Sequence, residues 1–304
     1  MSKNLKKSSE KAPEEYMNPR TDYSFKRIFA DPSNKHILLA MLNAYLSDYI
    51  GEIADIELMN PEQLGITKEG KRMSYDLYGK EEDKRRFIVE MQRGKLRFYV
   101  RRAVSYMSRA VSNSLQKGDL EYKIPEIVSL NLMDYNDPLI VKMNQYIQRV
   151  MLKNDENEIF YDDMMYIFVN LCIFANCKGD VSRMDEKQKW GYYLKNMEKL
   201  RMGDVSDETG IIKEFIDLCR LDNLNKKEMK EYKKSVLDYY DVQNAILCAK
   251  EDSYEEGMEA GLTEGAKNAK LEMAAVMLRN GLPISMISEV SGLSAEEIEK
   301  SIEI

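Results

Sequence analysis

Two acidic residues, Asp76 and Glu90, have the types and the spacing that could support metal-assisted chemistry. They lie in two strand-like segments, residues 72–79 and 85–92, which a short polar turn joins. If these strands pair antiparallel around that turn, position 76 lies directly across from position 90. Opposed residues in such a ladder have Cβ atoms roughly 4.5–5.5 Å apart and project to one face. Gln92 follows Glu90 by two residues and therefore shares that face.

This carboxylate pair would attract a divalent cation. Two adjacent carboxylates repel each other unless a cation or a proton lies between them. A pair that offers only oxygen ligands favours Mg²⁺ or Mn²⁺ over zinc. A bound Mg²⁺ could polarise a phosphodiester, position an attacking water and stabilise the leaving oxygen. The alternative is that Asp76 and Glu90 are two solvated strand residues that happen to be acidic.

The other residue types that often carry catalysis are scarce. His36 is the single histidine, so Ser-His-Asp and Cys-His mechanisms are not expected. The four cysteines lack the spacing of a zinc site and lie in apolar stretches, which predicts buried free thiols in a reducing compartment. They are Cys172, Cys177, Cys219 and Cys248. Any enzymatic chemistry is therefore expected to rest on carboxylates.

Basic residues surround the carboxylate pair. Residues 71–109 contain twelve Lys/Arg and five Asp/Glu, a local balance of +7. Arg97, Arg101 and Arg102 lie together on the helix expected after Gln92, where they could contact the phosphates of DNA. The alternative for each arginine is a solvated helix face.

Taken alone, the net negative charge of the whole chain argues against a nucleic-acid partner. The 304 residues include 52 acidic and 45 basic ones, for a net charge of −7, and 44% are hydrophobic. This composition predicts a folded soluble protein without a membrane partner, and the absence of a secretory signal predicts a cytoplasmic location. The net charge conceals a segregation, because residues 251–304 alone contain twelve acids and four bases. We therefore expect one basic face and an acidic appendage that stays off DNA.

The elements that must position the carboxylates follow from periodicity, caps and turns. The expected helices cover residues 21–29, 31–49, 95–117, 187–201, 211–223 and 226–250. The expected strands cover residues 53–59, 72–79, 85–92, 126–133 and 164–174. This order predicts an α/β core followed by a helical part.

Three regions follow from the changes in composition. Residues 1–17 are interpreted as a disordered basic tail, residues 18–250 as the main domain and residues 251–304 as an acidic helical appendage. In the appendage, Gly257, Gly261 and Gly265 recur every four residues, which allows close helix–helix approach. The appendage is therefore a candidate for oligomerisation or regulation, and a simple solvated tail is the alternative. Two short helices are expected after Pro283, with a break at Gly292 and a Ser294–Glu297 capping box.

These motifs together resemble those of a known family. Residues 21–29 match the pattern D-x-x-F-K-x-x-F, with Asp22 and Lys26 at its charged positions. Asp76, the strand end Val89-Glu90-Met91-Gln92 and Arg101 resemble the next block. In order and spacing the chain is similar to the Rpn recombination-promoting nucleases, also described as transposases, of the PD-(D/E)xK superfamily.

The resemblance implies a restriction-endonuclease-like mixed sheet flanked by helices and Mg²⁺-dependent cleavage of DNA in recombination or mobile-element activity. Asp76 and Glu90 would be the metal ligands. Gln92 would take the place of the lysine in the E-x-K pattern of the superfamily, and could orient a water but supply no charge. Asp22 and Lys26 would support the active site, or else only form an ion pair within their helix.

The leading hypothesis is a cytoplasmic, metal-dependent DNA endonuclease. The alternative is a catalytically weak or inactive protein that keeps the same fold to bind nucleic acid or a partner, and the glutamine in E-x-Q supports it. A toxin or defence effector would share the chemistry and differ in its context.

Overall fold

The computed structural model of this chain describes residues 14–63, 73–82, 85–94, 98–115, 123–137, 145–175, 177 and 181–300. Internal contacts divide the chain into two units, Met1–Val242 and Gln243–Ile304, and each unit is described by itself. None of the helices in the described ranges is long and apolar enough to cross a membrane.

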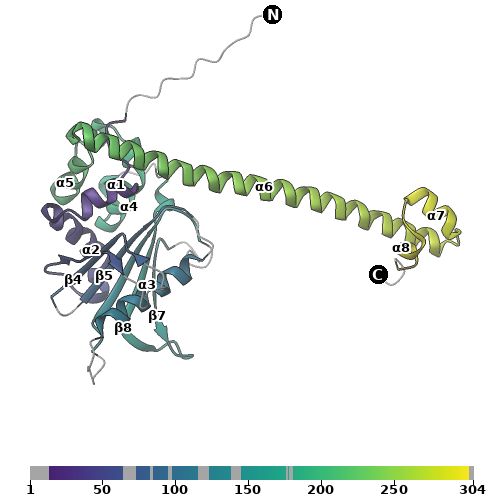
Figure 1. The fold of residues 1–304 in the computed structure, drawn as a ribbon, viewed down its shortest axis with the longest axis horizontal. Helices are drawn as coiled ribbons and strands as arrows, with labels where there is room; N and C mark the ends of the chain where they lie inside the picture. The colour runs from purple at the N-terminus through teal and green to yellow at the C-terminus, as the bar shows by residue number, and fades with distance from the viewer. Residues whose placement is uncertain are drawn as a thin grey trace, which may run out of the picture. The chain divides into compact units, whose positions relative to one another are not determined.

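A six-stranded mixed sheet carries the structure of the first unit, in the order β1-β4-β5-β6-β8-β7. Figure 1 labels its strands β4, β5, β7 and β8. Strands β5, β6 and β8 are parallel neighbours, and the pairs β1–β4, β4–β5 and β7–β8 are antiparallel. A separate pair is formed by β2 and β3. The strands are β1 (Glu57–Leu58), β2 (Glu62–Gln63), β3 (Met73–Ser74), β4 (Leu77–Glu81), β5 (Arg85–Gln92), β6 (Glu126–Met133), β7 (Ile147–Lys153) and β8 (Ile159–Asn170).

Helices cover both faces of this sheet. On one face, α1 (Asp22–Phe29), α2 (Lys35–Ile50), α4 (Glu186–Asn196) and α5 (Gly210–Leu218) share the largest apolar core with β4, β5, β6 and β8. On the other face, α3 (Tyr99–Ser114) packs its apolar side against β5 and β6 in a second core. The predicted fold class is therefore confirmed: a mixed α/β core flanked by helices, with a helical C-terminal region.

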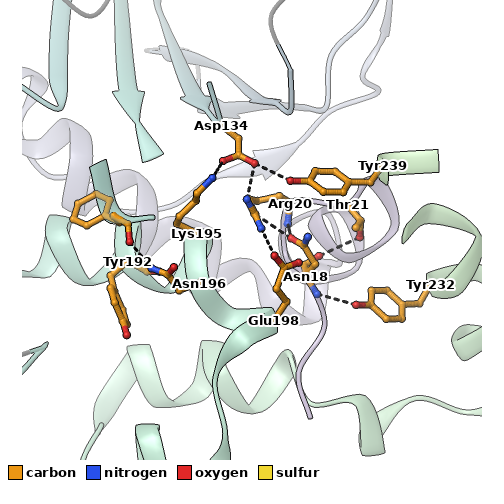
Figure 2. A network of polar contacts seen from close by, with 11 residues as sticks. Asn18, Arg20, Thr21, Asp134, Tyr192, Lys195, Asn196, Glu198, Tyr232 and Tyr239 are labelled. Atoms are coloured by element: carbon orange, nitrogen blue, oxygen red, sulfur yellow. Dashed lines mark hydrogen bonds and ion pairs between the residues drawn. The ribbon is translucent and has the colours of Figure 1, made fainter. Parts of the chain in front are cut away.

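A buried ionic network ties four distant parts of this unit together (Figure 2). Asp134, the first residue after β6, accepts hydrogen bonds from Arg20 over 2.5 Å and from the Tyr239 hydroxyl over 2.9 Å. Lys195 of α4 forms an ion pair with the other oxygen of Asp134, and Arg20 also contacts Glu198 over 2.7 Å. The side chains of Arg20 and Asp134 are 4% and 2% exposed. The network thus joins the N-terminal segment, β6, α4 and the long helix α6 (Lys226–Arg279).

The ordered part of the chain begins at a lower residue number than predicted. Tyr16 and Met17 are buried, and the backbone N–H of Met17 donates to the carbonyl of Cys219 over 2.7 Å. The prediction of disorder up to residue 17 is wrong for these two residues, because their apolar side chains join the core. Residues 1–13 lie outside the described residues.

Several strand predictions need correction. The segment 72–79 is not one strand, because the chain bends at Asp76 between β3 and β4. The bend places Tyr75 in the core under α3, whereas Leu77 lies in the core on the opposite face. The strand expected at 53–59 is reduced to β1, and the one expected at 164–174 is β8, which begins earlier and ends at Asn170. Edge strand β7 was not predicted at all.

The boundaries of several helices also differ from the predicted ones. Within the expected helix 95–117, the structure describes α3 from Tyr99 to Ser114, and residues 95–97 and 116–117 lie outside the described residues. The helices expected at 187–201 and 211–223 end earlier, and short 3₁₀ turns follow them. The helix expected at 226–250 continues without a break to Arg279, because this stretch has no proline to interrupt it.

The second unit contains the C-terminal part of α6 with α7 (Ile284–Ser291) and α8 (Ala295–Lys300). Their small core is formed by Ala274, Ile287, Leu293 and Ile298. The predicted break at Gly292 is confirmed, with a left-handed φ of 71° that suits glycine. The predicted capping box is also confirmed, because Ser294 Oγ accepts from the Glu297 N–H and the Glu297 carboxylate accepts from the Ser294 N–H.

Candidate active site

Asp76 and Glu90 lie side by side, as their spacing predicted. The register pairs Leu77 with Val89, so position 76 comes opposite position 90. The backbone N–H of Asp76 donates to Oε1 of Glu90 over 3.1 Å, and the backbone N–H of Met91 donates to Oδ2 of Asp76 over 2.7 Å. Each carboxylate is therefore held by the main chain of the opposite segment.

Glu90 lies in a nearly dry environment. The residue is 3% exposed, on the face of β5 that α3 covers. Burial, together with the neighbouring Asp76 carboxylate, raises the pKa of Glu90 to about 8. Burial also raises the pKa of Asp76, although its hydrogen bond from Met91 opposes this change. At neutral pH the pair therefore tends to hold a proton, which a metal ion would displace.

Arg102 of α3 approaches this pair. Its guanidinium lies 3.4 Å from Oε2 of Glu90 and 4.9 Å from the centre of the Tyr106 ring. Its positive charge opposes the rise in the pKa of Glu90. Arg102 was predicted to contact DNA phosphate, and that stays a prediction; in this structure it contacts a candidate metal ligand.

The two other predicted phosphate contacts have different outcomes. Arg101 is exposed, and its guanidinium lies 5.2 Å from the centre of the Phe98 ring, so it can reach a ligand from solvent. Arg97 lies outside the described residues.

The expected basic face is partly neutralised within the fold. Arg85 forms ion pairs with Glu81 and Glu126, at 3.0 and 2.7 Å. Lys80 pairs with Glu57 over 3.0 Å. These two bases therefore join neighbouring strands of the sheet, and the local charge of +7 overstates the number of cations that a phosphate backbone would meet.

Gln92 is the last residue of β5 and lies beside the carboxylates, but its side-chain amide already donates a hydrogen bond. Its side-chain Nε2 donates to the carbonyl of Gly94 over 3.0 Å, and the residue is 8% exposed. Its backbone carbonyl accepts from the N–H of Asp134 over 2.8 Å, which links it to the buried network of Figure 2. The remaining group with which Gln92 could orient a water is its side-chain oxygen.

Asp22 and Lys26 form the ion pair within α1 that the alternative interpretation predicted. Their side chains meet over 3.1 Å, and each is about half exposed. Asp22 also contacts Arg93, the residue after Gln92, over 3.5 Å, and its charge raises the pKa of Asp76. A cavity of about 660 Å³ opens here, and α1, Arg93 and the start of α6 line it. Asp22 is thus close to the carboxylate pair, whereas Lys26 lies on the cavity wall.

Three residues near the pair were not among the site residues predicted from the sequence. Arg93 connects the end of β5 to α1, as described above. Asn131 lies beside Glu90 in the β5–β6 register, and its Oδ1 accepts from the hydroxyl of Tyr99 over 2.7 Å. Burial and, after it, the nearby Glu90 carboxylate raise the pKa of Tyr99, so that ring lies near the carboxylates. One signal was available, because Asn131 is a polar residue between two leucines in the mostly apolar strand β6.

The site offers few metal ligands, and these are carboxylate oxygens, which Mg²⁺ prefers. Among the described residues, no group of three or more His, Cys, Asp or Glu side chains is arranged to hold a metal ion. Two adjacent carboxylates still fit Mg²⁺, which often binds through one or two carboxylates and keeps several waters. The four cysteines are free, and Cys219 is buried, but Cys248 is exposed, so the prediction of buried thiols is wrong for Cys248.

Comparison with known proteins gives one match. A family model described as PD-(D/E)XK nuclease family transposase matches residues 19–249. No curated protein and no solved structure matches the chain. The matched region contains the sheet, helices α1 to α5 and the carboxylate pair.

Proposed function

The chain belongs to the PD-(D/E)XK nuclease family of transposases, and on this basis we propose that it is a Mg²⁺-dependent DNA endonuclease. Asp76 and Glu90 are the metal ligands in this proposal. The observation that carries it is the contact between the two residues, in which the Asp76 N–H donates to Glu90 Oε1. Family membership supports a nuclease-like function and a divalent metal, and the choice of Mg²⁺ rests on the carboxylate oxygens.

In this proposal each residue of the site has its own role. Asp76 and Glu90 bind the ion, and the backbone hydrogen bonds that they accept keep them in place before it arrives. When bound, Mg²⁺ supplies Lewis acidity to the phosphodiester and lowers the pKa of a bound water. The side-chain oxygen of Gln92 accepts a hydrogen bond from the attacking water. Arg101 contacts a phosphate from the exposed side of α3.

Arg102 has a different role from that of Arg101. In the absence of a metal it lies 3.4 Å from Glu90 and partly neutralises that carboxylate. Once a cation occupies the site, Arg102 is free to contact the phosphate oxygens of the substrate, which suits the planar guanidinium. Asp22 supports the site through Arg93 and its charge near Asp76.

The second candidate is a protein of the same fold that binds nucleic acid or a partner with weak or no cleavage. Two observations favour it. Gln92 stands where a lysine would supply charge, and its amide already donates to Gly94. A role in recombination or mobile-element activity, a role as a toxin or defence effector, and a cytoplasmic location stay predictions from the sequence.

Cleavage of plasmid DNA tests the proposal. The purified full chain is incubated with plasmid in Mg²⁺, Mn²⁺ or EDTA, beside Asp76→Asn and Glu90→Gln. Both variants keep an oxygen that can accept the backbone hydrogen bonds, so they remove charge with little change in the fold. We expect each to lower cleavage by at least ~100-fold, because each removes a charged ligand.

A matched control and a second measurement make the result decisive. Glu57→Gln removes a well-exposed carboxylate from the same sheet and should cleave like the parent chain. Calorimetry of Mg²⁺ binding should show weakened binding in Asp76→Asn and Glu90→Gln only. Cleavage that persists in both variants rejects the site. DNA binding without cleavage in any metal supports the second candidate.

A further inference from the structure

The cavity beside the carboxylate pair has no role of its own in the proposed function. It has a volume of about 660 Å³ and is lined by residues of α1, by Arg93 after β5, and by residues of the part of α6 that belongs to the first unit. Ligand pockets in proteins commonly measure about 300–1,000 Å³. The cavity is therefore large enough to hold a ligand of the size of a nucleotide.

Hydrogen bonds fix the two helices that form the walls of this cavity. The backbone N–H of Tyr23 in α1 donates to Oγ of Ser235 in α6 over 3.1 Å. On either side of Ser235, the hydroxyl of Tyr232 accepts from the backbone N–H of Asn18 over 3.0 Å, and the hydroxyl of Tyr239 donates into the buried network of Figure 2. The walls are thus in place before a ligand arrives, which lowers the cost of binding one.

Asp22 and Arg93 connect the cavity to the carboxylate pair. Both residues line the cavity, and they contact each other over 3.5 Å. After burial and the hydrogen bond from Met91, the charges of Arg93 and Asp22 have the next largest effects on the pKa of Asp76, in opposite directions. Both residues are therefore close to this candidate metal ligand, and a group bound in the cavity would lie beside the metal site.

Three positively charged side chains from different segments line the cavity, namely Lys26, Arg93 and Lys234. Lys26 and Arg93 share the single carboxylate of Asp22, at 3.1 and 3.5 Å. Lys234 is exposed and forms no ion pair with any residue in the described ranges. The negative charge of Asp22 therefore offsets only part of this positive charge, and an anion can bind to the remainder.

The wall that α6 forms also offers hydrogen-bond acceptors. Glu231 and Asp238 line the cavity and are exposed. They lie three residues before and four residues after Lys234, so all three side chains project from one side of the helix. A ligand that suits this wall has an anionic group for the lysine and donor groups for the two carboxylates. Nucleotides combine a phosphate with hydroxyl and amino or imino donors.

We propose that the cavity binds a nucleotide through its phosphate monoester, which contacts Lys26, Arg93 and Lys234. The donor groups of the nucleoside face Glu231 and Asp238. A phosphate monoester carries about −1.5 to −2 charges at pH 7, whereas the phosphodiester inside a strand carries one, so several cations suit the monoester better. Two sources present this group, namely the phosphorylated end of a DNA strand and a free nucleotide.

The strand-end form of this inference rests on the proposed function and deepens it. A phosphorylated end held in the cavity would place a nearby phosphodiester of the same strand at Asp76 and Glu90. Binding in the cavity needs neither Mg²⁺ nor cleavage, because the three cations belong to the chain itself. A chain that binds the nucleotide but cleaves no DNA therefore refutes the proposed function alone.

Calorimetry of the full chain in EDTA tests the site, with thymidine 5′-monophosphate as the probe and thymidine as its phosphate-free comparison. We expect the monophosphate to bind at one site and thymidine to bind at least ~10-fold more weakly, because charge-assisted hydrogen bonds to the phosphate are lost. Lys26→Gln and Lys234→Gln should each weaken the monophosphate at least ~5-fold. Absence of saturable binding, or equal binding of the two probes, overturns the proposal.

Lys233→Gln is the matched control for Lys234→Gln. Lys233 is also exposed on α6 but does not line the cavity, so its variant loses the same charge one residue away. The control should bind thymidine 5′-monophosphate like the parent chain. An equal loss of affinity in Lys233→Gln and Lys234→Gln would show a general effect of charge and would overturn the assignment of the cavity.

Competition in EDTA distinguishes the two sources of the monoester. A short single-stranded oligonucleotide with a 5′ phosphate and the same strand with a 5′ hydroxyl are each added to the complex with thymidine 5′-monophosphate. We expect the phosphorylated strand alone to displace the probe, which identifies a strand end as the ligand. Displacement by neither strand identifies a free nucleotide. Equal displacement by both strands would show that the cavity binds the internal backbone, and it would overturn the proposed monoester site.

Discussion

The backbone N–H of Asp76 donates a hydrogen bond to Oε1 of Glu90 over 3.1 Å, across the hairpin of β4 and β5. Met91, the next residue of β5, returns a backbone hydrogen bond to Asp76 over 2.7 Å. The two hydrogen bonds hold the bend at Asp76, which lies just before β4, against β5. The two carboxylates are consequently placed together before any metal ion binds.

The first prediction separates the two substitutions of Asp76. Asp76→Ala leaves the N–H of Met91 without its acceptor and should lower the free energy of unfolding by about 1–3 kcal/mol. Asp76→Asn keeps an acceptor oxygen and should lower it by less. Urea denaturation in EDTA measures both. Equal losses in the two variants would show that the Met91 hydrogen bond contributes little.

The second prediction concerns pH and stability without metal. Glu90 has a pKa of about 8, above the 4.5 of an unperturbed glutamate, so the folded state binds more protons than the unfolded state between these values. The free energy of unfolding should therefore fall as pH rises from about 4.5 to 8. Glu90→Gln removes this titration and should flatten the profile in urea denaturation. A parent profile that rises across this range would contradict the prediction.

The third prediction concerns pH and metal binding. A metal ion must displace the proton of the pair, so the affinity for Mg²⁺ should increase with pH up to about 8. The increase should be up to roughly tenfold per pH unit for one displaced proton. Calorimetry in buffers of different ionisation enthalpy measures the released proton directly. Binding that is independent of pH between 6 and 8 would exclude such a displacement.

The fourth prediction concerns Arg102, whose positive charge opposes the rise in the pKa of Glu90. Arg102→Gln should raise that pKa further and move the pH dependence of Mg²⁺ binding to higher pH. Arg101→Gln, one residue away and in contact with Phe98 instead, is the matched control. If the pH midpoint of Mg²⁺ binding is the same in both variants, the 3.4 Å contact between Arg102 and Glu90 has no electrostatic effect in solution.

The fifth prediction concerns the network of Figure 2. Asp134→Ala leaves Arg20 and Lys195 without their shared carboxylate and should cost about 3–5 kcal/mol of stability, as expected when one partner of a buried ion pair is removed. Tyr239→Phe removes a single hydrogen bond and should cost only about 1 kcal/mol. Thermal unfolding compares them, and similar costs would mean that the ionic part contributes little.

The sequence by itself determined the pairing of the two carboxylates. The alternation of side chains along residues 85–92 and the short turn before them set the register, because a shift by one residue would turn every apolar side chain of β5 away from its core. The α/β class, the capping box at Ser294 and the break at Gly292 likewise depend on local patterns, and the structure has them where they were predicted.

Only the tertiary structure decided what surrounds that pair. The dry environment of Glu90, the approach of Arg102 from α3 and the contact of Asp22 with Arg93 join residues that are distant in sequence or on different elements. The same holds for the network around Asp134, whose partners come from three other parts of the chain. Local periodicity reports which side of an element is apolar. It carries no information on which elements meet, because that depends on how whole faces pack against each other.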